Sequence, residues 1–303
     1  MTSAALCYFS QTGTTRTIAE HIAEGLTRSG VSPALYPMDE TDPETLLAHD
    51  IIGIGLPVYM FRPPFNVLDF VQNLPDLSGK SFFVFVLFGS HPGSTAAIIR
   101  TLLAKKGGRD LGFHYSRGAD LYAGYVKRGT LLSPDRPSPD EKEDAATFGK
   151  ALPARFTDPA FTPEKDPHSA TVIDLIERAT CHRFLGRHLY TRLFTVDKAR
   201  CNGCGHCATL CPTDNITFDE NGHPLIGRDC LLCLSCELRC PKEALSSPFT
   251  STFLAPVMAF NLWQAKRLGV DHAPVRWAKG QVRRLTAPGD GTPPQKRWIT
   301  EKK

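Results

Sequence analysis

Eight of the ten cysteines fall into two copies of one spacing, and this spacing constrains the fold more than any other feature. Each copy reads C-x2-C-x2-C-x3-C-P. Gaps of two residues wind the backbone tightly enough for thiolates to converge on one centre, and the proline stops the loop from continuing as a helix. The pattern predicts iron–sulfur clusters. The two copies are Cys201, Cys204, Cys207 and Cys211 before Pro212, and Cys230, Cys233, Cys236 and Cys240 before Pro241.

Structural zinc is the alternative for these cysteines. Zinc ribbons normally separate two C-x2-C pairs by a long spacer and do not use a third close cysteine, so we favour iron. Residues 195–245 resemble a bacterial-type ferredoxin, a small α+β module with two [4Fe-4S] clusters. The resemblance implies that the fourth cysteine of each copy ligates the cluster of the other copy. The expected ligand sets are Cys201, Cys204, Cys207 and Cys240 for one cluster, and Cys230, Cys233, Cys236 and Cys211 for the other.

The two remaining cysteines, Cys7 and Cys181, lie outside both copies. A buried thiol commonly packs as a small apolar side chain. We therefore expect neither of them to have a redox role.

The first 125 residues alternate apolar runs with segments of helical period, which predicts an α/β fold with a doubly wound parallel sheet. The expected strands are Ala4–Phe9, Val31–Tyr36, Ile51–Leu56, Phe82–Phe88 and the stretch Asp110–Tyr125. The expected helices are Thr15–Leu26, Phe65–Val71, Thr95–Leu103 and Glu141–Leu152.

A loop rich in hydroxyl groups follows the first expected strand. Unpaired backbone N–H groups and the helix dipole favour an anion at the start of a helix, and a glycine permits close approach. The loop has no lysine and no second glycine, which excludes the usual nucleoside triphosphate and dinucleotide motifs. A well-capped helix start without a ligand is the alternative. The loop consists of Ser10, Gln11, Thr12, Gly13, Thr14 and Thr15.

This loop resembles the phosphate loop of flavodoxins, which holds the phosphate of FMN, and residues 1–155 match that family in layout. The resemblance implies two further flavin loops, both at carboxyl ends of strands, where open α/β sheets bind ligands. One would cover a face of the flavin ring, with Tyr59 or Met60 stacking on it, and the other would touch the pyrimidine side. The first contains Pro57, Val58, Tyr59 and Met60, and the second Phe88, Gly89, Ser90, His91 and Gly93.

One departure from the flavodoxin pattern concerns the second loop. Flavodoxins usually surround the ring with acidic residues, whereas this loop carries His91 and Pro92. A histidine disfavours the reduced, anionic flavin less than a carboxylate does. We therefore expect His91 to shift the flavin potential.

Composition shifts divide the chain into four segments. Residues 1–155 form the expected FMN domain, 156–194 a linker with an amphipathic helix over Val172–Phe194, and 195–246 the ferredoxin module. Residues 247–303 form an extension with ten basic and three acidic side chains, whose last 18 or so residues we expect to be disordered. Packing against the ferredoxin module is the expected role of this extension; contact with an acidic partner or an anionic membrane surface is the alternative, and no motif indicates nucleic-acid binding.

The order of domains resembles flavodoxin–ferredoxin fusion proteins over residues 1 to about 250. That resemblance implies an electron-transfer protein passing low-potential electrons between FMN and two clusters, with a ferredoxin or an oxidoreductase as redox partner. An FMN-dependent reductase of a small organic acceptor such as a quinone, and a docking scaffold without flavin, are the alternatives. We assign no catalytic residues. The start of the chain shows no secretory signal, and no apolar run reaches the roughly 20 residues of a membrane span, so we expect a cytoplasmic protein.

Overall fold

The computed structural model describes residues 2–168, 179–180 and 182–285. Contacts divide the chain into two compact units. The first contains Met1–Gly118 and Asp135–Ala179, and the second contains Ala119–Pro134 and Thr180–Lys303. The chain therefore leaves the first unit after Gly118 and returns to it at Asp135. We call residues 119–134 the excursion.

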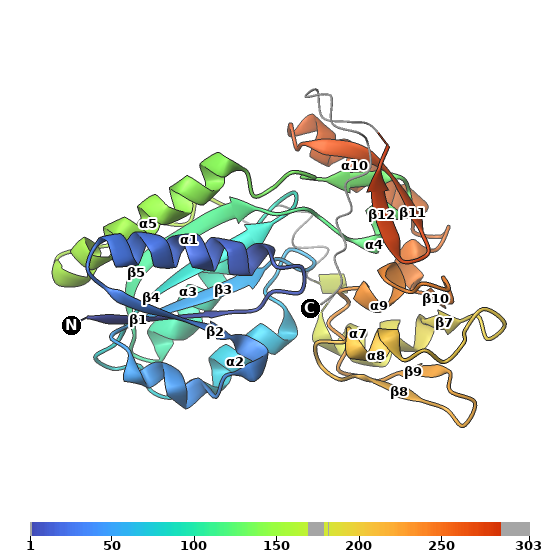
Figure 1. Ribbon diagram of the computed structural model, residues 1–303, viewed down its shortest axis with the longest axis horizontal. Coiled ribbons are helices and arrows are strands. Elements are labelled where there is room, and N and C mark those ends of the chain that lie inside the picture. Colours follow the sequence, from blue (N-terminus) through green and yellow to red (C-terminus); the bar gives the residue numbers. More distant parts are fainter. Residues whose placement is uncertain (1, 169–178, 181, 286–303) are drawn as a thin grey trace. The chain divides into compact units, whose positions relative to one another are not determined.

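A five-stranded parallel sheet forms the centre of the first unit, in the order β2-β1-β3-β4-β5 (Figure 1). Long apolar runs make β3 and β4 almost fully buried, as expected of strands covered on both faces. The strands are β1 (Ser3–Tyr8), β2 (Ser32–Pro37), β3 (Ile51–Pro57), β4 (Ser81–Phe88) and β5 (Arg109–Arg117).

Helices cover both faces of this sheet (Figure 1). α1 and α5 pack against each other over one face and share a core with the sheet that includes Ile18, Ile22, Phe83 and Phe148. α2 and α3 pair with each other. The helices are α1 (Thr14–Arg28), α2 (Phe65–Asn73), α3 (Thr95–Lys105) and α5 (Pro139–Thr157), with 3-10 turns η1 (Met38–Glu40) and η2 (Pro43–Ala48) after β2.

The doubly wound fold predicted from the sequence is confirmed, with one local exception. The stretch Asp110–Tyr125 is not strand throughout, because β5 ends at Arg117. Residues Ala123–Val126 instead form the short helix α4, which belongs to the second unit. The apolar side chains of this stretch are buried by that unit's own elements, which no local pattern in the stretch could reveal.

The cysteine motifs of the second unit are framed by short antiparallel pairs (Figure 1). β7 (Thr195–Val196) pairs with β10 (Leu245–Ser246), and β8 (Ile216–Phe218) pairs with β9 (Pro224–Ile226). Each motif contains one turn of helix, α8 (His206–Thr209) in the first and α9 (Ser235–Leu238) in the second. This is the small α+β module expected for the region.

The C-terminal extension packs within the second unit together with the excursion. β6 (Thr130–Leu132) of the excursion pairs with β11 in a three-stranded antiparallel sheet of order β12-β11-β6. A small core joins Tyr125 and Leu132 to Met258, Ala265 and Val270. The elements of the extension are η4 (Pro248–Thr250), α10 (Ala255–Arg267), β11 (His272–Ala278) and β12 (Gln281–Arg284).

The helix predicted over Val172–Phe194 falls partly on residues 172–178 and 181, which lie outside the described residues. In the described part, α7 (Arg183–His188) begins after an extended His182, and the 3-10 turn η3 (Tyr190–Leu193) follows it. From His182 onward the segment is therefore two short helices. The expected disorder of the last 18 or so residues also falls outside the described residues.

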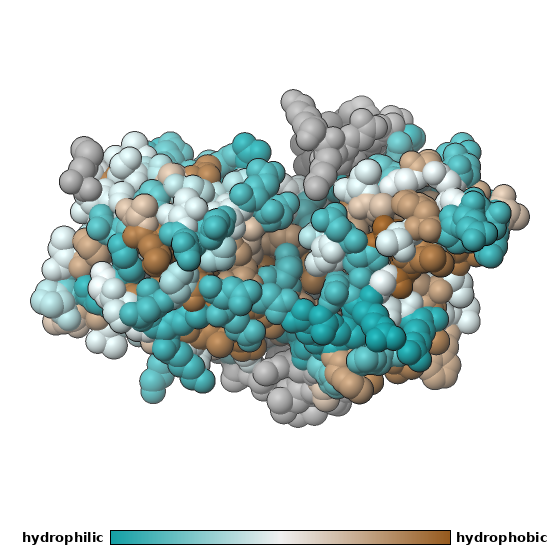
Figure 2. Space-filling view, turned by 90° about the horizontal axis from the view of Figure 1, so that it is seen from below, coloured by the Kyte–Doolittle hydropathy of each residue, from teal (hydrophilic) through white to brown (hydrophobic). Residues whose placement is uncertain are grey.

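Hydrophobic residues lie among hydrophilic ones on the surface (Figure 2). Several large apolar side chains on or beside α10 are exposed, among them Phe253, Phe260 and Trp263. Within the described residues, no helix is both long and apolar enough to cross a membrane.

Candidate cofactor sites

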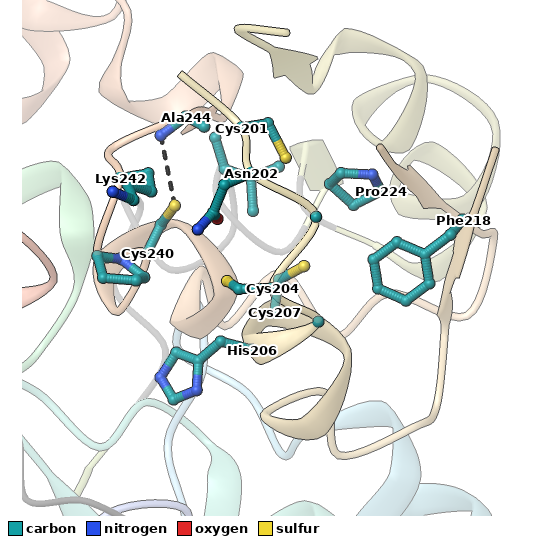
Figure 3. Close-up of a pocket in the computed structure, with 14 residues that line it drawn as sticks. Cys201, Asn202, Cys204, His206, Cys207, Phe218, Pro224, Cys240, Lys242 and Ala244 are labelled. Carbon is teal, nitrogen blue, oxygen red and sulfur yellow. Dashed lines mark hydrogen bonds between the residues drawn. The ribbon is translucent and has the colours of Figure 1, made fainter. Parts of the chain in front are cut away.

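Four cysteines line one pocket in the second unit (Figure 3). Cys201, Cys204 and Cys207 come from the first motif and Cys240 from the end of the second. Figure 3 shows their sulfur atoms around a common space, beside Asn202 and Pro224. Cys204 is exposed, whereas the other three are partly buried. The pocket thus brings together three neighbours in sequence and a fourth cysteine from far along the chain, which is the donor set of a cubane cluster.

The second group contains three cysteines of the second motif and one cysteine of the first. Cys230 lies close enough to Cys233 and Cys211 for their charges to interact, and Cys236 likewise interacts with Cys230 and Cys233. Cys236 also feels the charge of Cys207, which belongs to the first group. The two groups are therefore neighbours, and each contains a cysteine from the other motif.

The two motifs share one backbone conformation although their sequences differ. Gly203 and Gly205 of the first motif have positive φ, and so do Leu232 and Leu234 at the equivalent positions of the second. A non-glycine residue in this region costs about 1 to 2 kcal/mol. Both leucines are buried, at 2% and 1% exposure, so apolar burial offsets that cost.

Backbone amides point at several of the sulfur atoms. The N–H of Asn215 donates to Cys211 Sγ at 3.4 Å, and the N–H of Ala244 donates to Cys240 Sγ at 3.3 Å, at equivalent places in the two motifs. The N–H of Leu232 donates to Cys230 Sγ at 3.4 Å. Such donors stabilise negative charge on sulfur and tune a cluster bound there.

Burial disfavours thiolates at these positions in the absence of a cation. It raises the pKa of Cys207 to about 11 and that of Cys230 to about 12, and it raises the pKa of Cys236 above the ordinary value for a thiol. Neighbouring cysteines add to each of these shifts. Iron would supply the positive charge that the thiolates need, and its binding would release protons.

The arrangement of the sulfurs differs from that of a single-ion site. In the part of the chain that the structure describes, no three His, Cys, Asp or Glu side chains are placed to hold one metal ion. Sulfurs sharing one zinc would lie about 4 Å apart, since each Zn–S bond is about 2.3 Å. A cubane holds its thiolates further apart, at its corners, and takes a donor set of four cysteines such as the one that lines this pocket.

The predicted phosphate loop lies between β1 and α1. Gly13 is the N-cap of α1, with φ of 83°, and has no side chain to serve as a cap, but the Arg16 N–H donates to Ser10 Oγ at 3.4 Å. Thr12 is exposed, and its hydroxyl lies 3.3 Å from that of Thr14. Thr15 is buried at 1% exposure, so its hydroxyl contributes less to the surface of the loop than the prediction implied. A helix N-terminus that begins at a glycine, beside the exposed Thr12 hydroxyl, fits a phosphate group.

A tight turn follows β3 at the predicted position of the first flavin loop. Tyr59 and Arg62 exchange two backbone hydrogen bonds, of 3.0 and 3.1 Å, so Met60 and Phe61 occupy the tip, both with positive φ. The Tyr59 hydroxyl donates to Gln11 Oε1, and its ring meets Phe9 edge-on. Tyr59 thereby ties this loop to the phosphate loop, so Met60 and Phe61 are the better candidates for contact with a ring.

The second predicted loop touches the first. A Cβ on Gly93 would lie 2.4 Å from the carbonyl oxygen of Phe61, so only glycine permits this approach. The ring of His91 lies 6.2 Å from that of Phe61, and the N–H of Gly93 donates to His91 Nδ1 at 3.0 Å. The three predicted loops therefore adjoin one another at the carboxyl end of the sheet.

Sequence reasoning missed an aromatic group behind His91. His168 lies 5.5 Å from His91 and 4.9 Å from Tyr115, centroid to centroid. The Tyr115 hydroxyl donates to Asp166, and burial together with this bond raises the Tyr115 pKa. Burial, with the charge of His91, lowers the His168 pKa. Phe61 was not predicted either, although it directly follows the predicted residue Met60 in the sequence. No sequence pattern around His168 predicts its place beside His91.

Family models match two separate parts of the chain. The model described as a flavodoxin domain matches residues 5–126, and the model described as a 4Fe-4S dicluster domain matches residues 200–244. The chain joins a flavodoxin domain to a 4Fe-4S dicluster ferredoxin domain. The flavodoxin match runs beyond Gly118 into the excursion, which the contacts place in the second unit.

Several solved structures with some likeness to part of this chain are flavodoxins. A short-chain flavodoxin associated with a non-canonical PDU bacterial microcompartment is 19% identical, with a TM-score of 0.43, over 52% of this chain and 100% of that one. Flavodoxin 2 from Bacillus cereus is 21% identical, with a TM-score of 0.41, over 51% and 99%. The flavodoxin of Streptococcus pneumonia TIGR4 is 17% identical, with a TM-score of 0.41, over 50% and 99%. No curated protein matches the chain.

The flavodoxin domain implies FMN, and the dicluster domain implies iron–sulfur clusters. These two cofactors give the protein an electron-transfer role. Of the cysteines outside the motifs, Cys7 is fully buried on β1, and burial strongly raises its pKa, as expected of a packing thiol. Cys181 lies outside the described residues.

Proposed function

We propose that the protein passes low-potential electrons between FMN and two [4Fe-4S] clusters and exchanges them with a ferredoxin or an oxidoreductase. A flavin accepts one or two electrons, whereas a cluster passes one, so the pair can convert between the two modes. The protein's own part is to hold the cofactors, exclude water and adjust their potentials.

The four-cysteine pocket carries this proposal. Cys240 shares the pocket with Cys201, Cys204 and Cys207, although at least 33 residues separate it from them in sequence. Cys211 correspondingly lies near Cys230. This crossed arrangement supports two clusters, each bound by three cysteines of one motif and the fourth of the other.

The residues around the two groups of cysteines support different roles for the clusters. In the first motif Asn202, Gly203, Cys204 and His206 are exposed. In the second motif the residues between the ligands include four leucines that are at most 5% exposed, namely Leu231, Leu232, Leu234 and Leu238. Since electron transfer between proteins needs close approach, the first cluster is the better place for exchange with a partner.

The loops of the flavodoxin domain support FMN binding. The hydroxyls and the helix N-terminus near Gly13 would hold the phosphate, and the loops with Met60 and His91 would hold the ring. The hydrogen bond from Tyr59 to Gln11 would keep the phosphate and ring loops in register.

The test is anaerobic purification followed by cofactor analysis and stepwise reduction monitored by visible and EPR spectra. We expect one flavin, about eight iron and eight sulfide per chain, and two interacting cluster signals. We call the cluster of Cys201, Cys204 and Cys207 the exposed cluster, and the cluster of Cys230, Cys233 and Cys236 the buried cluster. Cys240→Ala should remove the signal of the exposed cluster and Cys211→Ala that of the buried cluster, and each variant should retain about four iron. Loss of the same signal in both variants would contradict the crossed assignment.

The same preparation separates the alternatives. A protein with clusters but no flavin would be a scaffold with a ferredoxin module. Rapid reduction of quinones, faster than electron exchange with any ferredoxin tested, would instead identify a reductase.

A further inference from the structure

A buried carboxylate lies directly beside one predicted cluster ligand. Glu237 follows Cys236 in α9, and its side chain is 0% exposed. Isolated buried charges are strongly unfavourable, so such a group requires close partners. The equivalent residue of the first motif, after Cys207, is Ala208. The buried carboxylate is therefore specific to one of the two groups of cysteines.

Three donors surround this carboxylate. The Lys127 ammonium donates to Oε1 as an ion pair. The Thr250 hydroxyl donates to the same oxygen at 2.6 Å, and the backbone N–H of Ser247 donates to Oε2 at 2.9 Å. Lys127 is the one ionic partner in this set, so it alone balances the charge.

Lys127 is itself held in place by the extension. Its side chain is 16% exposed, and Nζ lies 4.3 Å from the centre of the Trp277 ring, a cation–π geometry. The Trp277 indole N–H donates to the carbonyl oxygen of Leu238 at 2.7 Å, in the turn that carries Cys236. The excursion thus supplies the charge, and β11 fixes its position.

Reduction of a cluster adds one negative charge near Cys236. An uncompensated carboxylate at this place would oppose that charge in a poorly screened environment, whereas the Lys127–Glu237 pair has no net charge. Removing Lys127 would leave a net negative charge beside the cluster, and removing Glu237 would leave a net positive charge there. The two losses should therefore act in opposite directions.

We propose that Lys127 acts through Glu237 as a positioning and charge-balancing residue that sets the reduction potential of the cluster ligated by Cys236. This inference rests on the proposed function, because it requires the second cluster. It gives the excursion a part in the ferredoxin domain's chemistry, and it distinguishes the two clusters, since the charge of Glu237 acts on Cys236 whereas Ala208 stands at the equivalent place in the first motif.

The test is an EPR-monitored redox titration of the full-length protein and five variants at one pH. Lys127→Gln should lower the potential of the buried cluster, and Glu237→Gln should raise it. Each should change the reduced-to-oxidised ratio at fixed potential about tenfold, which is about 59 mV for one electron. The double variant and Lys127→Arg should stay within about twofold of the parent. Lys198→Gln, which removes an exposed lysine of the same unit, is the control and should shift neither cluster.

The outcomes decide between charge and structure. Opposite shifts in the single variants and their cancellation in the double variant support the proposal. Should the single variants lose iron, recovery of iron in the double variant supports it too. Equal shifts of both clusters, shifts of one sign in both single variants, or loss of iron in all three variants overturn it. A parent protein without clusters would refute the proposed function instead, so the two failures are distinguishable.

Discussion

The two units of this protein are stabilised in different ways. In the first, strands of six to nine residues form a parallel sheet whose central members are almost wholly buried. In the second, the strands around the cysteines have two or three residues each. A module with so little regular structure cannot depend on a large apolar core, and proteins of this kind rely on metal ligation.

The second unit compensates in a further way, by recruiting sequence from elsewhere. The excursion and the C-terminal extension form their own sheet and small core. They contact the turn of the second motif through Lys127, Trp277 and Gly280. Burial therefore stabilises the first unit, whereas metal ligation and recruited segments stabilise the second.

Removal of iron should change the stability of the two units more differently than any other treatment. We expect chelation under reducing conditions to abolish the calorimetric transition of the second unit and to leave that of the first nearly unchanged, because the buried thiols then lose their cation. The measurement is differential scanning calorimetry of the full chain before and after chelation. Two unchanged transitions would show that the second unit folds without its clusters.

Gly280 tests the contact between the extension and the cysteine loop. A Cβ there would lie 2.5 Å from the carbonyl oxygen of Arg239, next to Cys240, and the residue has a φ of 70°. Gly280→Ala should cost about 3 kcal/mol of unfolding free energy in the second unit, by backbone strain plus displacement of this loop.

Gly269→Ala is the matched control for that change. Gly269 has a φ of 71°, but no atom lies within 4 Å of the place that an alanine methyl would take, so only about 1 kcal/mol should be lost. Denaturant titrations followed by cluster absorbance give both values. Equal losses would mean that the extension does not support the loop.

Leu234 and Gly205 occupy equivalent positions in the two cysteine motifs and differ in how much apolar surface they bury. Leu234→Ala keeps the cost of a positive φ and removes a buried side chain, so we expect a loss of about 3 kcal/mol. Gly205→Ala adds only the conformational cost of about 1 kcal/mol, because nothing lies within 4 Å of the new methyl. The measurement is the rate of cluster release in denaturant, which should increase more in Leu234→Ala than in Gly205→Ala. A larger effect at Gly205 would contradict the burial argument.

Acid should affect the first unit through His114. Burial lowers the pKa of His114 to about 4. The unfolded chain takes up a proton near pH 6.5, which the folded chain refuses until about pH 4, so the unfolding free energy falls as the pH drops through this interval. About 2 kcal/mol should be lost between pH 7 and pH 5.

His114→Gln should flatten that pH dependence while keeping a partner for Ser116, whose hydroxyl lies 2.8 Å from His114 Nε2. His21→Gln is the control, since His21 is one-third exposed beside Glu24 on α1. Urea titrations of the first unit at several pH values measure the slope. An unchanged slope in His114→Gln would assign the acid sensitivity to another group.

The sequence predicted the parts of the fold that have a local pattern. The apolar runs of β1, β3 and β4 and the spacing of Ile18 and Ile22 on α1 identify buried faces directly. The cysteine spacing located both motifs, since ligand geometry leaves little freedom in the intervening residues. The predicted fold is therefore confirmed where neighbours in the sequence determine the structure, and the assignment of cysteines to clusters stays a prediction.

The remaining features depend on distant partners. Leu132 reads like any strand residue, and only pairing with His272 shows to which sheet it belongs. The sequence around Lys127 indicates only a surface lysine, and its contacts with Glu237 and Trp277 are visible only in the structure. Leu234 adopts a backbone that its residue type disfavours, so its conformation was visible only by comparison with Gly205.

The pairing of β6 with β11 also bears on how the protein is made. About 140 residues separate Leu132 from its partner His272. At about 5 to 20 residues per second, β6 is synthesised roughly 7 to 28 s before β11. During that interval Tyr125 and Leu132 lack Met258, Ala265 and Val270 as cover. A nascent chain of this protein therefore carries an unfinished apolar segment throughout that interval, and chaperones have that time to bind it.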